Sequence, residues 1–450
     1  MDQQLRHRDV ESIHNSCTKR CAHNTERGSK MNHQISTSRI QQDMELFEQF
    51  TSTPGQGITR LPFTVDVREC VTLLTARMKS AGLTVHEDAA GNLIGRKEGV
   101  YPEAPALIIG SHFDSVKSGG NFDGMAGIIV GLEVVRMLRD AGITLSHPIE
   151  VMATHDEEGM RFGTGFFGTK AMMGEVDEDY LHRYKDADGV SIYDAMICYG
   201  LDPRRIQEAA RDVEREIIAF LEVHIEQGPV LENTNTQLGL VDCIVGMQRY
   251  MITVKGRPDH AGTTPMDMRV DAMDCASQVI AQVSKLAKEA SSNSTVATVG
   301  FAKIEPGAMN IVPQEVTFSL DVRSKVQQNI DDIVAKVKEE LKRVCSEKGA
   351  TFTIDEKLNT SPAHLDEKLL GLLYKSCEKL GFSHRRMCSG AGHDALQTAP
   401  KIDTVMVFVP SKEGRSHCPV EWSEYSDLAN AAMVVCDMLM TNYSEQGGEL

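Results

Sequence analysis

The chain has 450 residues, of which 41% are hydrophobic and 25% are charged, and its formal net charge is −17. The length predicts two domains with buried cores, and the acidic balance disfavours binding to nucleic-acid phosphates or anionic membranes. The eleven cysteines are odd in number and widely scattered, which is typical of reduced thiols, so we expect a cytoplasmic protein.

The elements that follow the N-terminus predict an α/β domain. Residues 1–30 are polar and charged, and we expect them to form a disordered extension. Apolar runs at 106–110 and 149–153 predict buried strands, and the apolar stripe of 124–139 predicts a helix between them. This order predicts a right-handed βαβ unit in a mostly parallel central sheet with helices on both faces. In such sheets, ligands bind beyond the carboxyl ends of the strands.

The pattern changes after residue 242. Strands are expected near 250–255, 295–304, 315–321 and 351–356, with helices near 269–290 and 329–348. This β-α-β-β-α-β order is typical of a ferredoxin-like α+β domain. We therefore predict a domain at 243–357, inserted into a catalytic α/β domain that consists of 31–242 and 358–450.

Two short motifs follow the first two apolar strands and contain the donors that a divalent metal needs. The first contains His112, Asp114 and Asp123, and the second contains the pair Glu157 and Glu158. Imidazole and carboxylate donors without thiolate suit zinc, or a harder ion such as manganese, nickel or cobalt. Asp114 can orient the ring of His112 through its second nitrogen. Of two adjacent glutamates, one can bind metal while the other acts as general base.

Each of these residues also has a plain structural interpretation. His112 can cap a strand end, Asp123 can be a helix N-cap, and glutamate pairs are common on surfaces. Further histidines in suitable places are His224, at the end of a strand near 220–224, and His393 and His417, in loops rich in glycine or serine. Their positions favour the metal-site interpretation.

The inserted domain contributes three candidate substrate contacts. Arg323 can bind a substrate carboxylate with its planar fork of donors. His260 and Asn310 can then donate hydrogen bonds to a developing oxyanion. As the alternative, His260 and Asn310 stabilise turns and Arg323 pairs with a surface acid.

Several runs occur in a fixed order and together resemble the M20-type metallopeptidase superfamily, in particular its amidase/hydantoinase/carbamoylase branch. They are Gly-Ser-His-Phe-Asp-Ser-Val with Gly-Gly-Asn-Phe-Asp-Gly, Glu-Glu-Gly-Met-Arg-Phe-Gly, Leu-Glu-Val-His-Ile-Glu-Gln-Gly, His-Ala-Gly-Thr-Thr-Pro-Met and Ser-Gly-Ala-Gly-His-Asp. The resemblance extends from about residue 58 to the last helix. Any one run is weak evidence, whereas the ordered set is specific.

The resemblance implies a role for each candidate residue. It makes two divalent ions per subunit the cofactor, held by five ligands of which Asp123 bridges both ions: His112, Asp123, Glu158, His224 and His417. It implies that Glu157 is the general base and that His260 acts with it in catalysis. It implies substrate contacts from Asn310, Arg323, His393, Gln227 and Gln248. The inserted domain is implied to be a lid that also forms a homodimer.

The implied activity is hydrolysis of the ureido C–N bond of an N-carbamoyl-L-amino acid, with release of ammonia, carbon dioxide and the amino acid. Allantoate enzymes of the branch carry a glutamine directly after the glycine at Gly246, whereas Met247 holds that place here and Gln248 follows it. This departure favours N-carbamoyl amino acids over the alternative, an allantoate or ureidoglycolate amidohydrolase. A peptidase is disfavoured by His224, and a non-catalytic binding protein by the intact Glu157.

Overall fold

The computed structural model describes residues 36–291 and 294–444, so the extension expected at 1–30 lies outside the described residues. The chain divides into two compact units. Unit 1 contains the described residues up to Leu240, together with Glu367–Arg385 and residues from Lys401 onward, and unit 2 contains Val241–Asp366 and Arg386–Pro400. None of the helices in these residues is long and apolar enough to cross a membrane.

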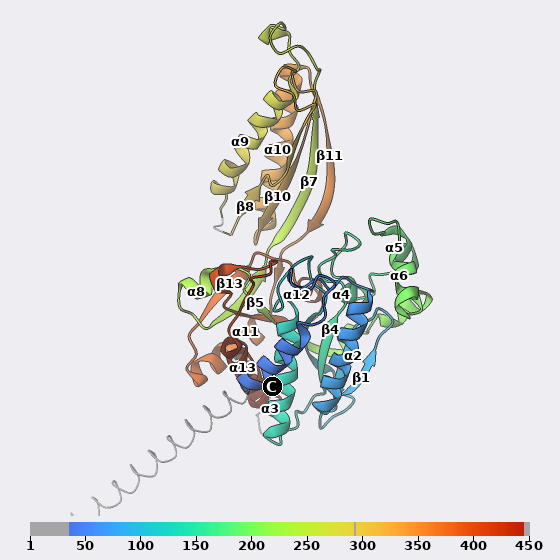
Figure 1. Cartoon of the computed structure of the whole chain (residues 1–450). Helices are drawn as coiled ribbons and strands as arrows, with labels where there is room; N and C mark the ends of the chain where they lie inside the picture. Colours follow the sequence, from blue (N-terminus) through green and yellow to red (C-terminus); the bar gives the residue numbers. More distant parts are fainter. Residues whose placement is uncertain (1–35, 292–293, 445–450) are drawn as a thin grey trace, which may run out of the picture. The chain divides into compact units, whose positions relative to one another are not determined.

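Unit 1 has a mixed sheet with a parallel centre (Figure 1). Its strands are β1 (Thr84–Glu87), β2 (Leu93–Lys97), β3 (Ala106–His112), β4 (Ile149–Thr154), β5 (Ile217–Ile225) and β14 (Thr404–Val409). They lie in the order β1-β2-β4-β3-β5-β14. The pairs β4–β3, β3–β5 and β5–β14 are parallel, whereas β1 and β2 form an antiparallel edge. The predicted mostly parallel α/β sheet is therefore confirmed.

The helices of unit 1 pack against this sheet or against one another. They are α2 (Val65–Ser80), α3 (Met125–Asp140), α4 (Phe167–Met172), α5 (Glu178–Arg183), α6 (Ile192–Tyr199), α7 (Val213–Glu216), α8 (Val230–Asn233), α11 (Glu367–Leu380) and α13 (Tyr425–Tyr443), with short 3₁₀ turns η1 (Pro203–Ala209) and η3 (Lys412–Gly414). Helix α3 is buried along nearly its whole length and packs beside α13 (Figure 1). Burial on all sides explains why its sequence is apolar beyond a single stripe.

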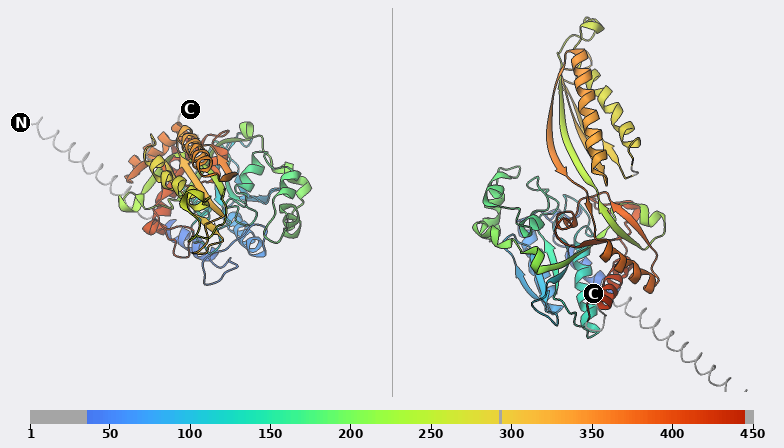
Figure 2. Two further views of the ribbon diagram at one scale, coloured as in Figure 1. Left: turned by 90° about the horizontal axis from the view of Figure 1, so that it is seen from above. Right: turned by 180° about the vertical axis from the view of Figure 1, so that it is seen from behind.

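Unit 2 is an antiparallel sheet with two helices on one face (Figures 1 and 2). Its elements are β7 (Gly246–Lys255), η2 (Met266–Met268), α9 (Ala272–Lys288), β8 (Val296–Thr298), β9 (Ala302–Glu305), β10 (Glu315–Ser324), α10 (Gln327–Lys348) and β11 (Thr351–Thr360), followed by β12 (Ala363–His364) and α12 (Asp394–Thr398). The strand order β11-β7-β10-β8 is that of the predicted ferredoxin-like topology. Every second residue of β10 is buried, because only one face of the sheet is covered by helices.

Two details of unit 2 differ from the sequence-based expectation. The strand expected at 295–304 is divided into β8 and β9, which pair with successive parts of β10. Gly300 N–H and Phe301 N–H donate to Ser319 Oγ between these two pairings, which interrupts the ladder. Helix α9 begins later than expected, since the Asp271 carboxylate caps it by accepting bonds from two main-chain N–H groups.

The boundary between the units passes through two strands. These are β6 (Leu238–Ile244) and β13 (His384–Ser389), which pair with each other, and each begins in unit 1 and ends in unit 2. The hydrophobic cores of the units are nevertheless separate. The core of unit 1 includes side chains of β3, α3 and α13, whereas that of unit 2 is formed by the sheet and helices between Tyr250 and Cys345.

Candidate metal centre

The candidate ligands of unit 1 converge because three neighbouring parallel strands end at one edge of its sheet. His112 is the last residue of β3, Glu157 and Glu158 follow β4, and His224 lies near the end of β5. Asp123 lies just before α3, and His417 is in the loop between β14 and α13. The carboxyl ends of parallel strands are the usual place for a site in such a sheet.

Asp123 is at the centre of the cluster. Its Oδ1 lies 3.3 Å from His112 Nε2 and 3.1 Å from His224 Nε2, while its Oδ2 lies 3.1 Å from His417 Nε2. Glu158 Oε1 is 3.4 Å from the same His417 nitrogen. Each carboxylate oxygen of Asp123 therefore faces a different set of donors.

Three groups of side chains in unit 1 have donor atoms within 4.8 Å of one another. The groups are His112–Asp123–His224, Asp123–Glu158–His417 and His112–Glu157–Glu158. Asp123 belongs to the first two, which contain all five ligands that the resemblance implies. The structure thus brings these five residues and Glu157 together, and the groups have the donor types and spacing of a divalent-metal site.

The electrostatics of the cluster also fit a cation. Burial raises the pKa of Asp123, but hydrogen bonds with His112, His224 and His417 outweigh it and hold that pKa well below its usual range. Burial and the negative charge of Asp123 raise the pKa of Glu158 to about 7. Two carboxylates buried this close together are stabilised in their charged form by positive charge nearby, which a divalent cation supplies. Glu158 Oε1 is also buried and accepts no hydrogen bond from the described residues, so its contact with His417 Nε2 is an ion pair alone.

Main-chain oxygens orient the two buried imidazoles. His112 Nδ1 lies 3.1 Å from Asp114 O but 3.8 Å from Asp114 Oδ1, and His224 Nδ1 lies 2.9 Å from Ile225 O. Both rings therefore present Nε2 to Asp123. The Asp114 carboxylate accepts bonds from Glu157 N–H and Glu158 N–H instead, at 3.0 and 3.2 Å. Asp114 thus orients the His112 ring mainly through its carbonyl, and its carboxylate fixes the turn that carries the glutamate pair.

Gln227 and His155 support the cluster in different ways. Gln227 adopts a positive φ of 56°, and its side-chain amide donates to Asp123 Oδ2 at 2.7 Å. His155 stacks on Phe63 with ring centroids 4.2 Å apart, and its Nε2 accepts from Phe63 N–H. Burial lowers the pKa of His155 to about 3, so this ring is neutral and structural.

Two residues of the His417 loop were not singled out from the sequence. Ser416 Oγ lies 3.1 Å from Asp123 Oδ2, and Glu421 accepts bonds from the main chains of both the Asp123 and the His417 loops. In the sequence, Glu421 is marked only by its position, as an acidic residue four places after the candidate ligand His417.

The candidate residues of unit 2 form two groups within that unit. His260 and Asn310 are exposed and lie on adjoining segments, where Ala261 N–H donates to Asn310 O. His260 Nδ1 accepts from the N–H groups of Gly262 and Thr263. A neutral ring therefore carries its proton on Nε2, which can serve as a donor.

Arg323 belongs to the second group. Its guanidinium donates to Asp321 and to Gly390 O, and Arg249 donates to the same Asp321 carboxylate. His393 belongs to the same loop as Gly390, and its Nε2 lies 2.8 Å from Ser389 Oγ. This loop therefore contacts Arg323 through Gly390 O.

Gln248 is placed differently from the other predicted contacts. It is buried, and its side-chain amide donates to Asp331 of α10 and accepts from the Tyr250 hydroxyl. The structure therefore does not bring Gln248 to either group in unit 2.

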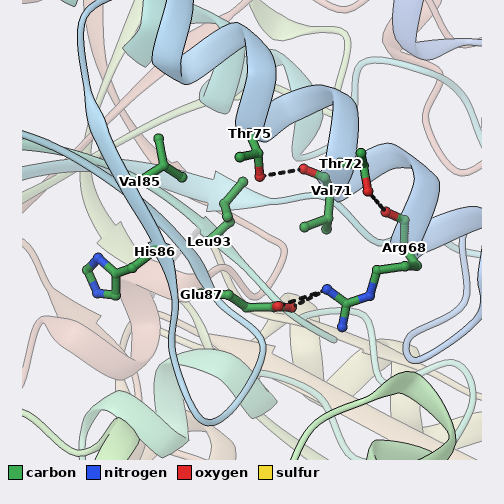
Figure 3. Close-up of a pocket in the computed structure, with 8 residues that line it drawn as sticks. All are labelled: Arg68, Val71, Thr72, Thr75, Val85, His86, Glu87 and Leu93. Atoms are coloured by element: carbon green, nitrogen blue, oxygen red, sulfur yellow. Dashed lines mark hydrogen bonds and ion pairs between the residues drawn. The ribbon is translucent and has the colours of Figure 1, made fainter.

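Unit 1 also has a separate cavity of about 270 Å³ between α2, β1 and β2 (Figure 3). Arg68 lines it, but both oxygens of Glu87 accept bonds from this guanidinium, which also lies over the Tyr199 ring. The Arg68 guanidinium is thus already paired, and no group of metal-type donors is found at this cavity among the described residues.

The sequence matches the family described as Peptidase family M20/M25/M40 over residues 105–441. It is 42% identical to the N-carbamoyl-L-amino-acid amidohydrolase of Paenarthrobacter aurescens, over 88% of this chain and 96% of the relative. It is 34% identical to the allantoate amidohydrolase of Escherichia coli K12, over 89% of this chain and 96% of the relative.

The fold is similar to a crystal structure of an amidase of the hydantoinase/carbamoylase family from Burkholderia multivorans. The TM-score is 0.83 at 32% identity, and the match covers 91% of this chain and 98% of that chain. These matches confirm the resemblance that the ordered motifs indicated. The chain belongs to the M20 peptidase family, and the relatives reported above are amidohydrolases of that family's hydantoinase/carbamoylase type.

Proposed function

We propose that this chain hydrolyses the ureido C–N bond of an N-carbamoyl-L-amino acid and releases ammonia, carbon dioxide and the amino acid. The observation that carries the proposal is the match to an enzyme of that name over nearly its whole length, combined with an intact set of donors around Asp123. Allantoate or ureidoglycolate hydrolysis is the second candidate, supported by the Escherichia coli relative.

We propose that two divalent ions, zinc or else manganese, cobalt or nickel, bind at the shared carboxylate. His112, Asp123 and His224 would hold one ion, and Asp123, Glu158 and His417 would hold the other. Divalent ions at such a site lower the pKa of water and polarise a carbonyl oxygen.

Glu157 is the proposed general base. Its Oε2 lies 3.9 Å from His112 Nε2, at the edge of the donor cluster, and the residue is buried. In our proposal it takes a proton from the attacking water and later delivers it to the leaving nitrogen. Its neighbour Glu158 is occupied as a ligand, so the two carboxylates divide the chemistry between them.

We propose that the inserted domain, 243–357, is a lid that binds the substrate and mediates dimerisation. His260 Nε2 and Asn310 would donate to the developing oxyanion, and Arg323 would bind the carboxylate of the substrate. The paired contacts of Arg323 with Asp321 and Gly390 pre-orient its guanidinium. A cytoplasmic location stays a prediction from the sequence.

A panel of substrates tests the proposed activity. We expect ammonia release from N-carbamoyl-L-amino acids with added divalent metal, and much slower release from the D-enantiomers. Release from allantoate or ureidoglycolate alone would favour the second candidate. Cleavage of dipeptides without release of ammonia from any ureido compound would refute both.

Replacing Arg323 with alanine is expected to raise KM for carboxylate substrates by about 10- to 100-fold, since a charge-assisted hydrogen bond contributes about 1.5–3 kcal/mol. Steady-state kinetics with an N-carbamoyl-L-amino acid measure this. The matched control is the same substrate as its carboxamide, on which the variant and the parent should act alike. An unchanged KM for the carboxylate would remove Arg323 from the binding site.

Metal binding is expected to release protons and to strengthen with pH. The hydrogen bond with Asp123 raises the pKa of His417 to about 9, so the metal-free ring is protonated at pH 7 to 8 and must lose that proton to bind metal. The apparent affinity should therefore rise between pH 7 and pH 9. Calorimetry at pH 8 in buffers of different ionisation enthalpy should show release of about one proton from this ring, and replacing His417 with glutamine should remove that contribution. Affinity that does not change between pH 7 and 9 would contradict this.

A further inference from the structure

The carboxylate of Glu421 connects the two loops that carry Asp123 and His417. Its Oε1 accepts from Phe122 N–H and Asp123 N–H, both at 3.0 Å. Its Oε2 accepts from Ser416 Oγ at 2.7 Å and from His417 N–H at 3.2 Å. Both oxygens are therefore fully used, and each serves a different loop of unit 1.

Two of these four donors are the main-chain N–H groups of proposed metal ligands. Hydrogen bonds to a buried carboxylate are stronger than those between neutral groups. His417 has a positive φ of 56°, a strained conformation for a residue other than glycine, and it persists only when its surroundings hold it. The bond from His417 N–H to Glu421 is one such restraint.

Gly120 provides a second observation, independent of the hydrogen bonds. A Cβ atom at Gly120 would lie 2.3 Å from both Glu421 Cβ and Glu421 Oε1. The φ of Gly120 is not in the left-handed region, so the glycine is needed for space and not for its backbone conformation. The Gly-Gly turn before Asp123 thus leaves room for the Glu421 side chain.

Glu421 and Asp123 compete for the Ser416 hydroxyl, and Asp123 Oδ2 also accepts a hydrogen bond from the Gln227 amide. The Ser416 hydroxyl has one proton and lies 2.7 Å from Glu421 Oε2 but 3.1 Å from Asp123 Oδ2. A donor with one proton serves the closer acceptor. Glu421 therefore takes up the hydroxyl, which would otherwise be a further donor to Asp123 Oδ2.

We propose that Glu421 is a positioning residue, which fixes Asp123 and His417 in the geometry that binds the divalent ions. The proposal deepens the proposed function and rests on its metal site, but not on the identity of the substrate. Glu421 itself contacts no reacting atom.

The test is Glu421→Gln. A glutamine can accept bonds through one oxygen only, so one of the two loops is released while the shape of the side chain is kept. We expect zinc or manganese affinity, measured by chelator competition, to fall by about 10- to 100-fold, as for other partners of metal ligands. At limiting metal kcat should fall, KM should stay within about twofold, and excess metal should restore much of the activity.

The readouts separate positioning from a purely structural role. If Glu421 only stabilises the fold, the Tm values of the metal-free and metal-loaded protein will fall together and metal affinity will not change, which would overturn the proposal. Glu424→Gln is the matched control, because Glu424 is an exposed glutamate of the same segment and its carboxylate accepts a hydrogen bond only from the Trp422 indole among the side-chain bonds described. It should leave metal affinity and Tm unchanged.

Gly120→Ala approaches the same contact from the other loop. It should weaken metal binding in the same way, and combining it with Glu421→Gln should add little, since both disturb one contact. Metal binding is measured without substrate, so a parent protein that binds metal but hydrolyses no ureido compound would refute the proposed function alone. A parent protein that binds no divalent metal would overturn this proposal as well.

Discussion

Replacing Glu157 with glutamine is expected to lower kcat by about 10²- to 10⁴-fold while leaving the metal content and KM nearly unchanged. This is the usual contribution of a positioned general base. The amide keeps the size of the side chain but cannot accept the proton of the attacking water. Metal analysis and steady-state kinetics of the purified variant test the expectation together.

Glu158→Gln is the informative comparison, because it makes the same chemical change at the adjacent residue. We expect this variant to lose metal as well as activity, since Glu158 lies beside His417 in one of the donor groups. Replacing the exposed Glu178 with glutamine should change neither quantity. A Glu157 variant with a nearly normal rate, or one that loses its metal, would show that the roles of the pair are assigned wrongly.

Replacing Asp123 with alanine is expected to have the largest effect on the site. The carboxylate is common to two donor groups, so its loss should empty both metal positions and reduce activity by more than roughly 10³-fold, beyond the 10- to 100-fold typical of residues that only support a ligand. Elemental analysis should find almost no bound metal, even after incubation with excess zinc or manganese.

The loss of this charge should also change the metal-free protein. Asp123 gives the largest contribution to the raised pKa of His417, so that pKa should fall towards its ordinary value in the alanine variant. NMR titration of the imidazole can follow this shift. As control, Asp202→Ala removes a half-buried aspartate far from the cluster in sequence, whose carboxylate accepts hydrogen bonds from the guanidinium and the main-chain N–H of Arg204. Retention of one tightly bound ion by the Asp123 variant would contradict a bridging role.

The sequence predicted the elements that place the ligands because their signals are local. The runs around β3 and β4 are mostly apolar, with Glu150 as the exception in β4, as expected for strands covered on both faces, and glycines mark the turns that follow. His112, Glu157 and Glu158 could therefore be assigned to one edge of a parallel sheet before any distance was known. The inserted topology was predictable for the same reason, since its helices are amphipathic and its strands alternate.

The contacts that could not be predicted join residues far apart in the sequence. Glu421 is four residues from His417, but its bonds to Phe122 and Asp123 depend on how two loops meet. Likewise, Asp114 was expected to hold the His112 ring through its carboxylate. That carboxylate instead accepts hydrogen bonds from two main-chain N–H groups that follow β4. Main-chain donors leave no trace in the sequence, so side-chain motifs alone overstate what a carboxylate is free to do.

The first and last strands of the segment from β7 to β11 pair with each other, and this pairing has a consequence for protein engineering. Met247 at the start of β7 pairs with Thr360 at the end of β11, and a Cβ atom at Gly246 would lie 2.6 Å from Pro362 N. The chain therefore enters and leaves this segment at nearly one point, and the segment has a hydrophobic core of its own. Such a segment can be exchanged as a cassette, or replaced by a turn of a few residues, without a long artificial linker.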